Sequence, residues 1–251
     1  MKNSLSNKNI IIGTVSVVLM TGLWGTASTL MGSDHLLPGP WTTLCATLEL
    51  FTRKDFLIIV GSTVLRGLAG FAIALASGFA LGILGGLSDA FNAFMRPWVI
   101  LVRSTPVVAF VLLAIIWFNS DTVPVFIGVL TMFPIVYLNV VEGIGSIDPK
   151  IVEMAAFYKV TGRRLLHEVY LPSIGPFAVS GISSAVGIGW RAIVVGEVLS
   201  LPQYGIGTVM HSAQTFLQVD VLIAWTLVTV FFGVVFEKLI RFMQPDRMNV
   251  K

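Results

Sequence analysis

The chain has 251 residues, of which 55% are hydrophobic and only 12% are charged. A soluble domain of this size needs more charge to cover its surface, so the composition excludes that class and indicates an integral membrane protein. The formal net charge of +3 does not point to nucleic acid, because basic residues in a membrane protein mark its cytoplasmic loops. With one cysteine, Cys45, and three histidines, neither an intrachain disulfide nor a metal site is expected.

Six apolar stretches have about the 20 residues that a helix needs to cross the hydrocarbon core of a membrane. The sequence therefore predicts an all-α integral membrane protein with six transmembrane helices. In chain order, the stretches are residues 10–31, 58–87, 98–118, 123–144, 172–199 and 221–242. The first is longer than the apolar region of a signal peptide and no A-x-A cleavage site follows it, so we expect it to remain as a span.

The basic residues outside these spans predict the orientation of the chain. If the N-terminus is cytoplasmic, most of them fall on the cytoplasmic side, and the positive-inside rule favours that arrangement. They are Lys2, Lys8, Arg96, Lys150, Lys159, Arg163, Arg164, Lys238, Arg241, Arg247 and Lys251. On the external side lie Arg53 and Lys54. Six spans then return the C-terminus to the cytoplasm.

Small residues recur at every fourth position in the second and fifth spans. They are Gly70, Ala74, Gly78, Gly82 and Gly86, and then Gly181, Ala185 and Gly189. Such grooves let helix backbones approach closely in lipid, so we expect a packed bundle rather than independent anchors.

The cytoplasmic loop at residues 145–171 predicts two short amphipathic helices. Asp148 is a plausible N-cap with Pro149 at the first helical position, and a second helix is expected to start near Thr161. The exposed residues of these helices could rest on lipid headgroups or dock into a groove of a soluble partner, and the pattern alone leaves both alternatives open.

The loop resembles the EAA loop of permeases of ATP-binding-cassette importers, in which the proline of a Leu-Pro pair follows the motif glutamate by 19 residues. Glu153, Ala155 and Leu171-Pro172 fall in that register. Other matching pieces are Leu65-Arg66-Gly67, Gly70-Phe71, Pro106 with Ala109, Trp117-Phe118, Phe133-Pro134-Ile135 with Asn139 and Gly143, Asp148-Pro149, Gly196-Glu197 and Gly205-Ile206-Gly207. Together they resemble the nitrate, sulfonate and taurine branch of the binding-protein-dependent, MetI-like permeases.

The resemblance implies a MetI-like permease bundle with cytoplasmic coupling helices. Residues 1–57 would supply a peripheral transmembrane helix and an external loop, and residues 58–251 a five-helix core with its coupling loop at 145–171. In the family this loop enters a cleft of the ATPase subunit. The residues implied in that contact are Glu153, Ala155, Ala156, Phe157, Tyr158, Lys159 and Gly162. The family has glycine where this chain has Lys159, and Met154 replaces the first motif alanine, so we expect the turn to shift to Gly162.

The resemblance also implies a function and a set of partners. The chain would be the permease subunit of an ATP-driven importer in a bacterial inner membrane, with two ATPase subunits, an extracytoplasmic binding protein and a second copy of itself. No P-loop is present, so we expect neither an enzyme nor a cofactor site, and ATP would be bound by the partner. The expected substrate is a small anion such as a sulfonate, nitrate or taurine. The alternatives are a heterocyclic vitamin precursor as substrate, or a secondary transporter or membrane scaffold that has no ATPase partner.

Charged residues inside the spans are candidates for the transport pathway. Arg66 and Arg103 lie near the ends of their spans and are expected to snorkel to the interface. Arg191 and Glu197 are six residues apart in the fifth span, so they face different sides of one helix and are not expected to pair. For both, a structural ion pair with another helix and a role in translocation stay open. The candidate pathway residues are Arg191, Glu197, Glu142 and Asn139.

Overall fold

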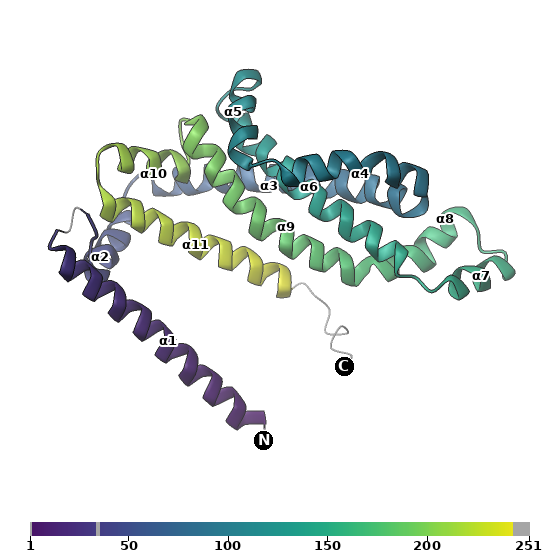
Figure 1. Cartoon of the computed structure of the whole chain (residues 1–251), viewed down its shortest axis with the longest axis horizontal. Helices are drawn as coiled ribbons and strands as arrows, with labels where there is room; N and C mark the ends of the chain where they lie inside the picture. Colours follow the sequence, from purple (N-terminus) through teal and green to yellow (C-terminus); the bar gives the residue numbers. More distant parts are fainter. Residues whose placement is uncertain (1, 34–35, 243–251) are drawn as a thin grey trace. The chain divides into compact units, whose positions relative to one another are not determined.

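In the computed structural model, residues 2–33 and 36–242 are described, and helices are their only regular secondary structure (Figure 1). The helices are α1 (Lys2–Met31), α2 (Pro40–Leu50), α3 (Phe56–Leu87), α4 (Asp89–Ser104), α5 (Val107–Trp117), α6 (Thr122–Gly145), α7 (Pro149–Phe157), α8 (Gly162–Leu165), the π-helix η1 (Leu166–Tyr170), α9 (Leu171–Ser200), α10 (Ile206–Thr215) and α11 (Val219–Phe242). The predicted all-α class is confirmed.

The chain divides into two compact units. One contains the described residues up to Leu57 together with Val209–Thr229, and the other contains Ile58–Thr208 and the described residues from Val230 onward. Helices α3, α10 and α11 each cross the boundary between the units. These units reflect packing within one chain, so the division into a peripheral helix and a transport core stays a prediction.

Five helical segments of the described chain are long and apolar enough to cross a membrane, and a bent pair of helices supplies a sixth. The segments are Ile11–Met31, Phe56–Leu87, Thr122–Gly145, Gly162–Ser200 and Val219–Ile240, and the bent pair is α4 with α5. The prediction of six spans therefore agrees with the structure when the bent pair counts as one.

The third span is not the single helix that the sequence suggested. Helix α4 ends at Ser104, Thr105 is extended, and α5 leaves at 100° to α4. Pro106 is the cause, because its ring disfavours the helical conformation of the preceding residue and it has no N–H for the helical ladder. The break lies inside the apolar stretch that was expected to run straight through.

The fifth span also differs from the expectation, because it does not begin at Pro172. The second helix of the cytoplasmic loop, α8, continues through the π-helical turn η1 into α9 without a break. Pro172 cannot donate a backbone hydrogen bond to the preceding turn, and a π-helical turn is a common way for a helix to absorb such a defect. The second half of the cytoplasmic loop is consequently continuous with α9, the span that follows it.

The core of the larger unit lies where α6 packs along α9, and α3 covers it with its groove of small residues. A Cβ atom added at Gly78 would lie 2.7 Å from Val136, and one added at Gly82 would lie 2.8 Å from Val140. Real side chains do not approach so closely, so α6 fits against α3 only because these positions lack a side chain. The predicted close packing is confirmed. The buried cluster beneath is formed by Ala74, Met132, Val136, Val140, Ile144, Ile174, Ala185 and Ile193.

Gly82→Val should destabilise the bundle by about 1–3 kcal/mol, because an overpacked interface has to shift or adopt strained rotamers. The matched control is Gly61→Val in the same helix, where an added Cβ meets nothing within 4 Å. Thermal unfolding of both variants in detergent measures the difference. An equal loss of stability in the two variants would show that helix propensity, and not close packing, governs these glycines.

Candidate functional site

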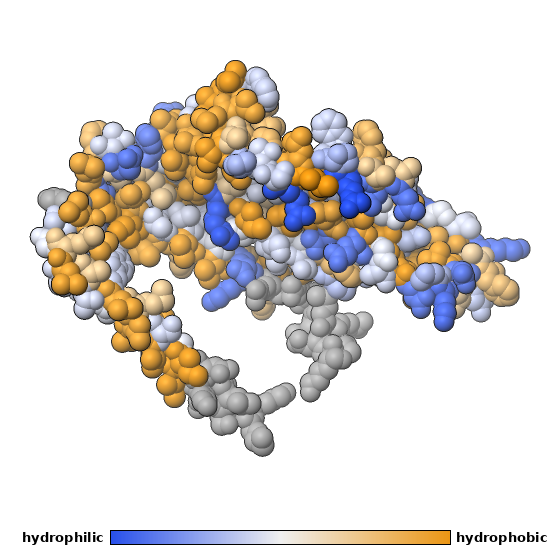
Figure 2. Space-filling view, viewed as in Figure 1, coloured by the Kyte–Doolittle hydropathy of each residue, from blue (hydrophilic) through white to orange (hydrophobic). Residues whose placement is uncertain are grey.

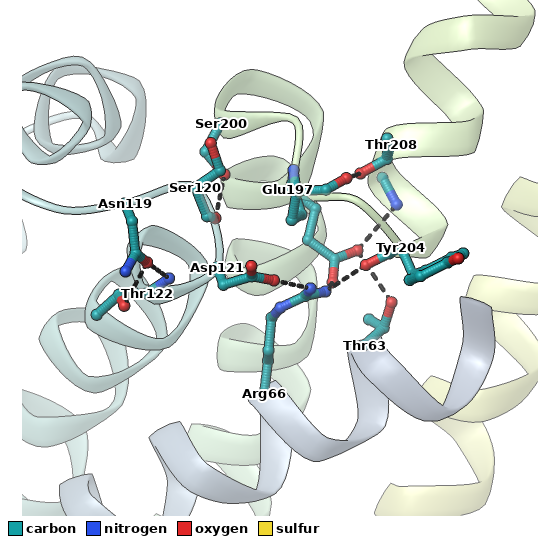
Figure 3. Close-up of polar contacts among 12 residues, drawn as sticks. Thr63, Arg66, Asn119, Ser120, Asp121, Thr122, Glu197, Ser200, Tyr204 and Thr208 are labelled. Carbon is teal, nitrogen blue, oxygen red and sulfur yellow. Dashed lines mark hydrogen bonds and ion pairs between the residues drawn. The ribbon is translucent and has the colours of Figure 1, made fainter. Parts of the chain in front are cut away.

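A carboxylate buried in the larger unit is the centre of its most extensive polar cluster among the described residues. The Glu197 side chain, near the end of α9, has no exposed surface. Its Oε2 accepts hydrogen bonds from the Thr63 hydroxyl at 2.9 Å and from the Gly207 backbone N–H at 3.0 Å. Its Oε1 accepts from Arg66 Nη1 at 2.6 Å (Figure 3). Both carboxylate oxygens are therefore satisfied, by three partners from two segments of the chain, α3 and the first turn of α10.

Arg66 extends this cluster to two further segments. Its Nη1 also donates to the Tyr204 carbonyl at 2.7 Å, and its Nη2 lies 2.5 Å from Asp121 Oδ1 (Figure 3). The Thr63 hydroxyl accepts in turn from the Ile206 N–H at 2.9 Å. We call the set the Glu197 cluster; its members are Thr63, Arg66, Asp121, Glu197, Tyr204, Ile206 and Gly207. It joins α3, α9, the start of α6, the loop between α9 and α10, and the first turn of α10.

The geometry of the Glu197 cluster corrects one expectation and resolves another. Arg66 does not snorkel: its side chain is only 11% exposed and points at two carboxylates. The spacing of Arg191 and Glu197 predicted that they would not pair, and they do not. Glu197 instead forms an ion pair with Arg66 of α3. The sequence left an ion pair of Glu197 with another helix open, but it did not identify Arg66 as the partner, because Arg66 was expected to snorkel. The signal available was one cation and one anion placed in the outer halves of two neighbouring spans.

The other candidate pathway residues are not gathered beside Glu197. Arg191 is exposed, and its Nε donates to the Gly187 carbonyl of its own helix at 3.1 Å. Asn139 is half-buried against Gly181, which is ten residues, or about 15 Å of helix, before Arg191. Glu142 is exposed one turn further along α6. The four residues therefore occupy different depths of the bundle.

The cytoplasmic loop begins as the sequence predicted. The Asp148 side chain caps α7 by accepting from the Lys150 N–H at 2.9 Å, and Pro149 occupies the first turn. Helix α7 then ends in a Schellman turn: the Lys159 N–H donates to the Ala156 carbonyl and the Val160 N–H to the Ala155 carbonyl, both at 2.9 Å. This motif places Lys159 in the left-handed conformation, with φ of 57°.

The turn has therefore not moved from the position where the family has glycine. Lys159 adopts the conformation that a glycine would adopt at low cost, and Gly162 is a second left-handed residue with φ of 58°. The expectation that Gly162 replaces the motif glycine is wrong. Instead, a lysine is held in the strained conformation by the two hydrogen bonds that close the helix.

The exposed surface of α7 is aromatic and apolar. Phe157 is 84% exposed, Tyr158 72% and Met154 57%, and the two aromatic rings contact each other edge to face. Ala155, in contrast, is only 7% exposed. A partner would therefore meet the aromatic pair first, and the contact of Ala155 with a partner stays a prediction. Glu153, Ala156, Lys159 and Gly162 are exposed.

Arg66→Met should lower the free energy of unfolding by about 3–5 kcal/mol, because it leaves the Glu197 carboxylate buried without its cation. The double variant Arg66→Met with Glu197→Gln should recover most of that loss, since the amide oxygen of glutamine still accepts hydrogen bonds without a charge. Asp121, whose side chain is 68% exposed, gives the control: Asp121→Asn should cost less than about 1 kcal/mol. Thermal unfolding in detergent measures the stability of the three variants. A double variant less stable than Arg66→Met would contradict the prediction.

Lys159→Val should open the turn after α7, because a β-branched residue in the left-handed conformation costs about 1–3 kcal/mol. Lys159→Gly should leave the turn closed. Hydrogen exchange of the Val160 amide reports the bond that the turn depends on, with at least about tenfold faster exchange expected in the valine variant. Similar exchange in the two variants would mean that the conformation of Lys159 does not hold the turn.

Comparison of the sequence with known proteins identifies the family of this chain. The family described as binding-protein-dependent transport system inner membrane component matches residues 78–248. A putative aliphatic sulfonates transport permease of Bacillus subtilis is 27% identical over 84% of this chain and 77% of its own length. The corresponding Escherichia coli protein is 31% identical over 76% and 73%. The Escherichia coli taurine transport system permease is 26% identical over 93% and 86%. This chain therefore belongs to the inner membrane components of binding-protein-dependent transport systems, the permease family to which its loop pointed.

Proposed function

We propose that this chain forms the translocation pathway of an ATP-driven importer for a small anion, and that α7 couples it to a separate ATPase subunit. The observation that carries the coupling is the aromatic pair Phe157–Tyr158, exposed on a short helix between two spans. Large aromatic side chains are the usual energetic centres of protein interfaces, and they are costly to leave in water.

The attachment of the loop supports a mechanical role. Helix α7 is tied by its Schellman turn to α8, which continues through η1 into α9. Because α9 packs along α6 in the core, a displacement of α7 by a partner would be transmitted to the spans instead of being absorbed by a flexible linker. The lipid surface is the rival occupant of this loop, and the experiment below separates the two.

The partners follow from the family. Importers of this kind use an external binding protein and a pair of ATPases, so we propose two ATPase subunits, one binding protein and a second copy of this permease. ATP would be bound by the ATPase, since this sequence has no P-loop. The basic residues favour cytoplasmic N- and C-termini in a bacterial inner membrane, which places α7 on the side where ATP is available.

An anionic substrate is supported by the names of the relatives. They are described as permeases for aliphatic sulfonates and for taurine, and both kinds of molecule carry a sulfonate group. A heterocyclic vitamin precursor is the weaker proposal, because nothing in the named relatives supports it. Arg191, Asn139 and Glu142 stay proposed pathway residues, whereas Glu197 has no exposed surface from which to contact a solute in this chain.

Phe157→Ala should weaken binding of the ATPase at least about tenfold, because truncating an aromatic anchor removes more than about 1.4 kcal/mol of interface energy. Phe216→Ala is the matched control: this phenylalanine is 71% exposed but lies in the turn before α11, which the orientation places outside. Co-purification of the ATPase with each permease, and ATP hydrolysis in liposomes, are the measurements.

Retention of the ATPase by Phe157→Ala, together with normal thermal stability of the permease, would show that α7 rests on the lipid surface. A loss of the ATPase with both Phe157→Ala and Phe216→Ala would show that general exposed apolar surface, and not the coupling helix, binds the partner. Either result would remove the support for coupling through this loop.

A further inference from the structure

A cavity of about 280 Å³ lies beside the break between α4 and α5. It is bordered by Arg103 and Thr105 at the break, by Thr131 and Pro134 of α6, and by Ile188 of α9. Helix α6 runs from Thr122 to Gly145 and α9 from Leu171 to Ser200, so these lining residues lie near the middle of both spans. The cavity is therefore at mid-depth of the membrane, and Arg103 is not at the end of a span.

This position overturns the expectation that Arg103 snorkels. A guanidinium at the middle of the hydrocarbon core has to pair with an anion or face a water-filled space. Throughout residues 2–33 and 36–242, no carboxylate lies within ion-pair distance of Arg103, and no hydrogen bond of its side chain is found. Arg66, in the outer half of α3, is in contrast fully engaged by two carboxylates. Among the described residues, therefore, nothing neutralises the charge of Arg103.

The other polar groups of the cavity do not compete for that role. The Thr105 hydroxyl donates to the Leu101 carbonyl and the Thr131 hydroxyl to the Ile127 carbonyl, both at 2.8 Å, so their protons are used within their own helices. Arg103 is the side chain of this lining with N–H donors that remain available, and an arginine has five of them in a planar fork suited to oxyanions. The cavity can therefore donate to an anion but offers no negative side chain to a cation.

A second cation without a counter-ion among the described residues, Arg191, lies on the face of α9 that borders the cavity. Arg191 follows the lining residue Ile188 by three positions, which places both on one side of the helix. In the part of the chain that the structure describes, Arg191 has no ion-pair partner, and its one hydrogen bond goes to a carbonyl of its own helix. Figure 2 shows hydrophilic side chains set among hydrophobic ones over the region where α4, α6 and α9 lie.

We propose that this cavity is an anion-binding station of the translocation pathway, in which Arg103 contacts the transported sulfonate group and Arg191 adds positive potential. The proposal rests on the proposed function and adds to it the residue that recognises the substrate class. The volume of the cavity is several times the roughly 30 Å³ that one water molecule occupies in the liquid, so a small oxyanion and part of its hydration shell fit. The cavity lies at the break between α4 and α5. Interrupted backbone at membrane depth is stable only inside protein or beside a water-filled cavity, so the break itself favours a hydrated space here.

The test measures the electrostatic potential of the cavity with a cysteine at Thr105. Thr105→Cys is made in a Cys45→Ser background, because Cys45 is the single cysteine of the chain. The purified full-length permease in lipid nanodiscs is reacted with an anionic sulfonatoethyl and a cationic trimethylammonium-ethyl methanethiosulfonate, each rate being normalised to that reagent's rate with a small free thiol. The normalised anion-to-cation ratio should be about ten or more, the lower end of what focused potentials give.

Arg103→Gln should bring this ratio close to one, whereas Arg96→Gln should leave it unchanged, because Arg96 is an exposed residue two turns earlier in α4 and does not line the cavity. Millimolar ethanesulfonate should slow the labelling of Thr105→Cys when Arg103 is present and not in the Arg103→Gln variant. A cysteine that neither reagent reaches, a ratio that survives Arg103→Gln, or labelling indifferent to ethanesulfonate would each overturn the proposal. The measurement needs neither ATPase nor ATP, so its failure is separate from a failure of the ATPase to bind α7.

Discussion

The Arg66–Glu197 ion pair is the interaction on which the arrangement of the larger unit depends. An unpaired carboxylate with no exposed surface would be too costly to keep ionised, so the fold has to bring a cation and further donors to it. Those donors come from α3 and from the first turn of α10, and Asp121 fixes the other side of the guanidinium. The pair thus sets the relative positions of segments that lie more than a hundred residues apart in sequence. Its net contribution to stability is smaller than the penalty for breaking it.

The contrast between Arg66 and Arg103 explains how one membrane protein uses the same residue type in two ways. Arg66 is surrounded by two carboxylates and a carbonyl, so its charge is neutralised within the chain. Arg103 stands beside a cavity with no negative side chain in its lining. The first arrangement holds helices together, and the second leaves an attractive potential for a mobile anion. If the proposed anion site is correct, compensation of charge, and not depth in the membrane alone, separates the structural Arg66 from Arg103, which is available for transport.

Two prolines accompany interruptions in the helices of the larger unit. Pro106 separates α4 from α5 and opens space between α5, α6 and α9. Pro172 lies two residues after the π-helical turn through which α8 joins α9. In both places a lost backbone hydrogen bond interrupts an otherwise regular helix. Under the proposed function, the first interruption makes room for a solute, and the second joins the cytoplasmic loop to the span that follows it.

The sequence by itself determined the membrane class, the helical content, the approximate spans, the glycine groove and the loop with its capped helix, because each follows from composition, periodicity or local backbone chemistry. Asp148 and Pro149, for example, specify the start of α7 without help from the rest of the chain. Only the tertiary structure decided that Glu197 pairs with Arg66, that Ala155 is buried while Phe157 is exposed, and that Arg103 has no ion-pair partner among the described residues. Contacts between residues far apart in sequence depend on the rotation and depth of each helix in the bundle. Hydropathy constrains these weakly, and close packing of α3, α6 and α9 sets them.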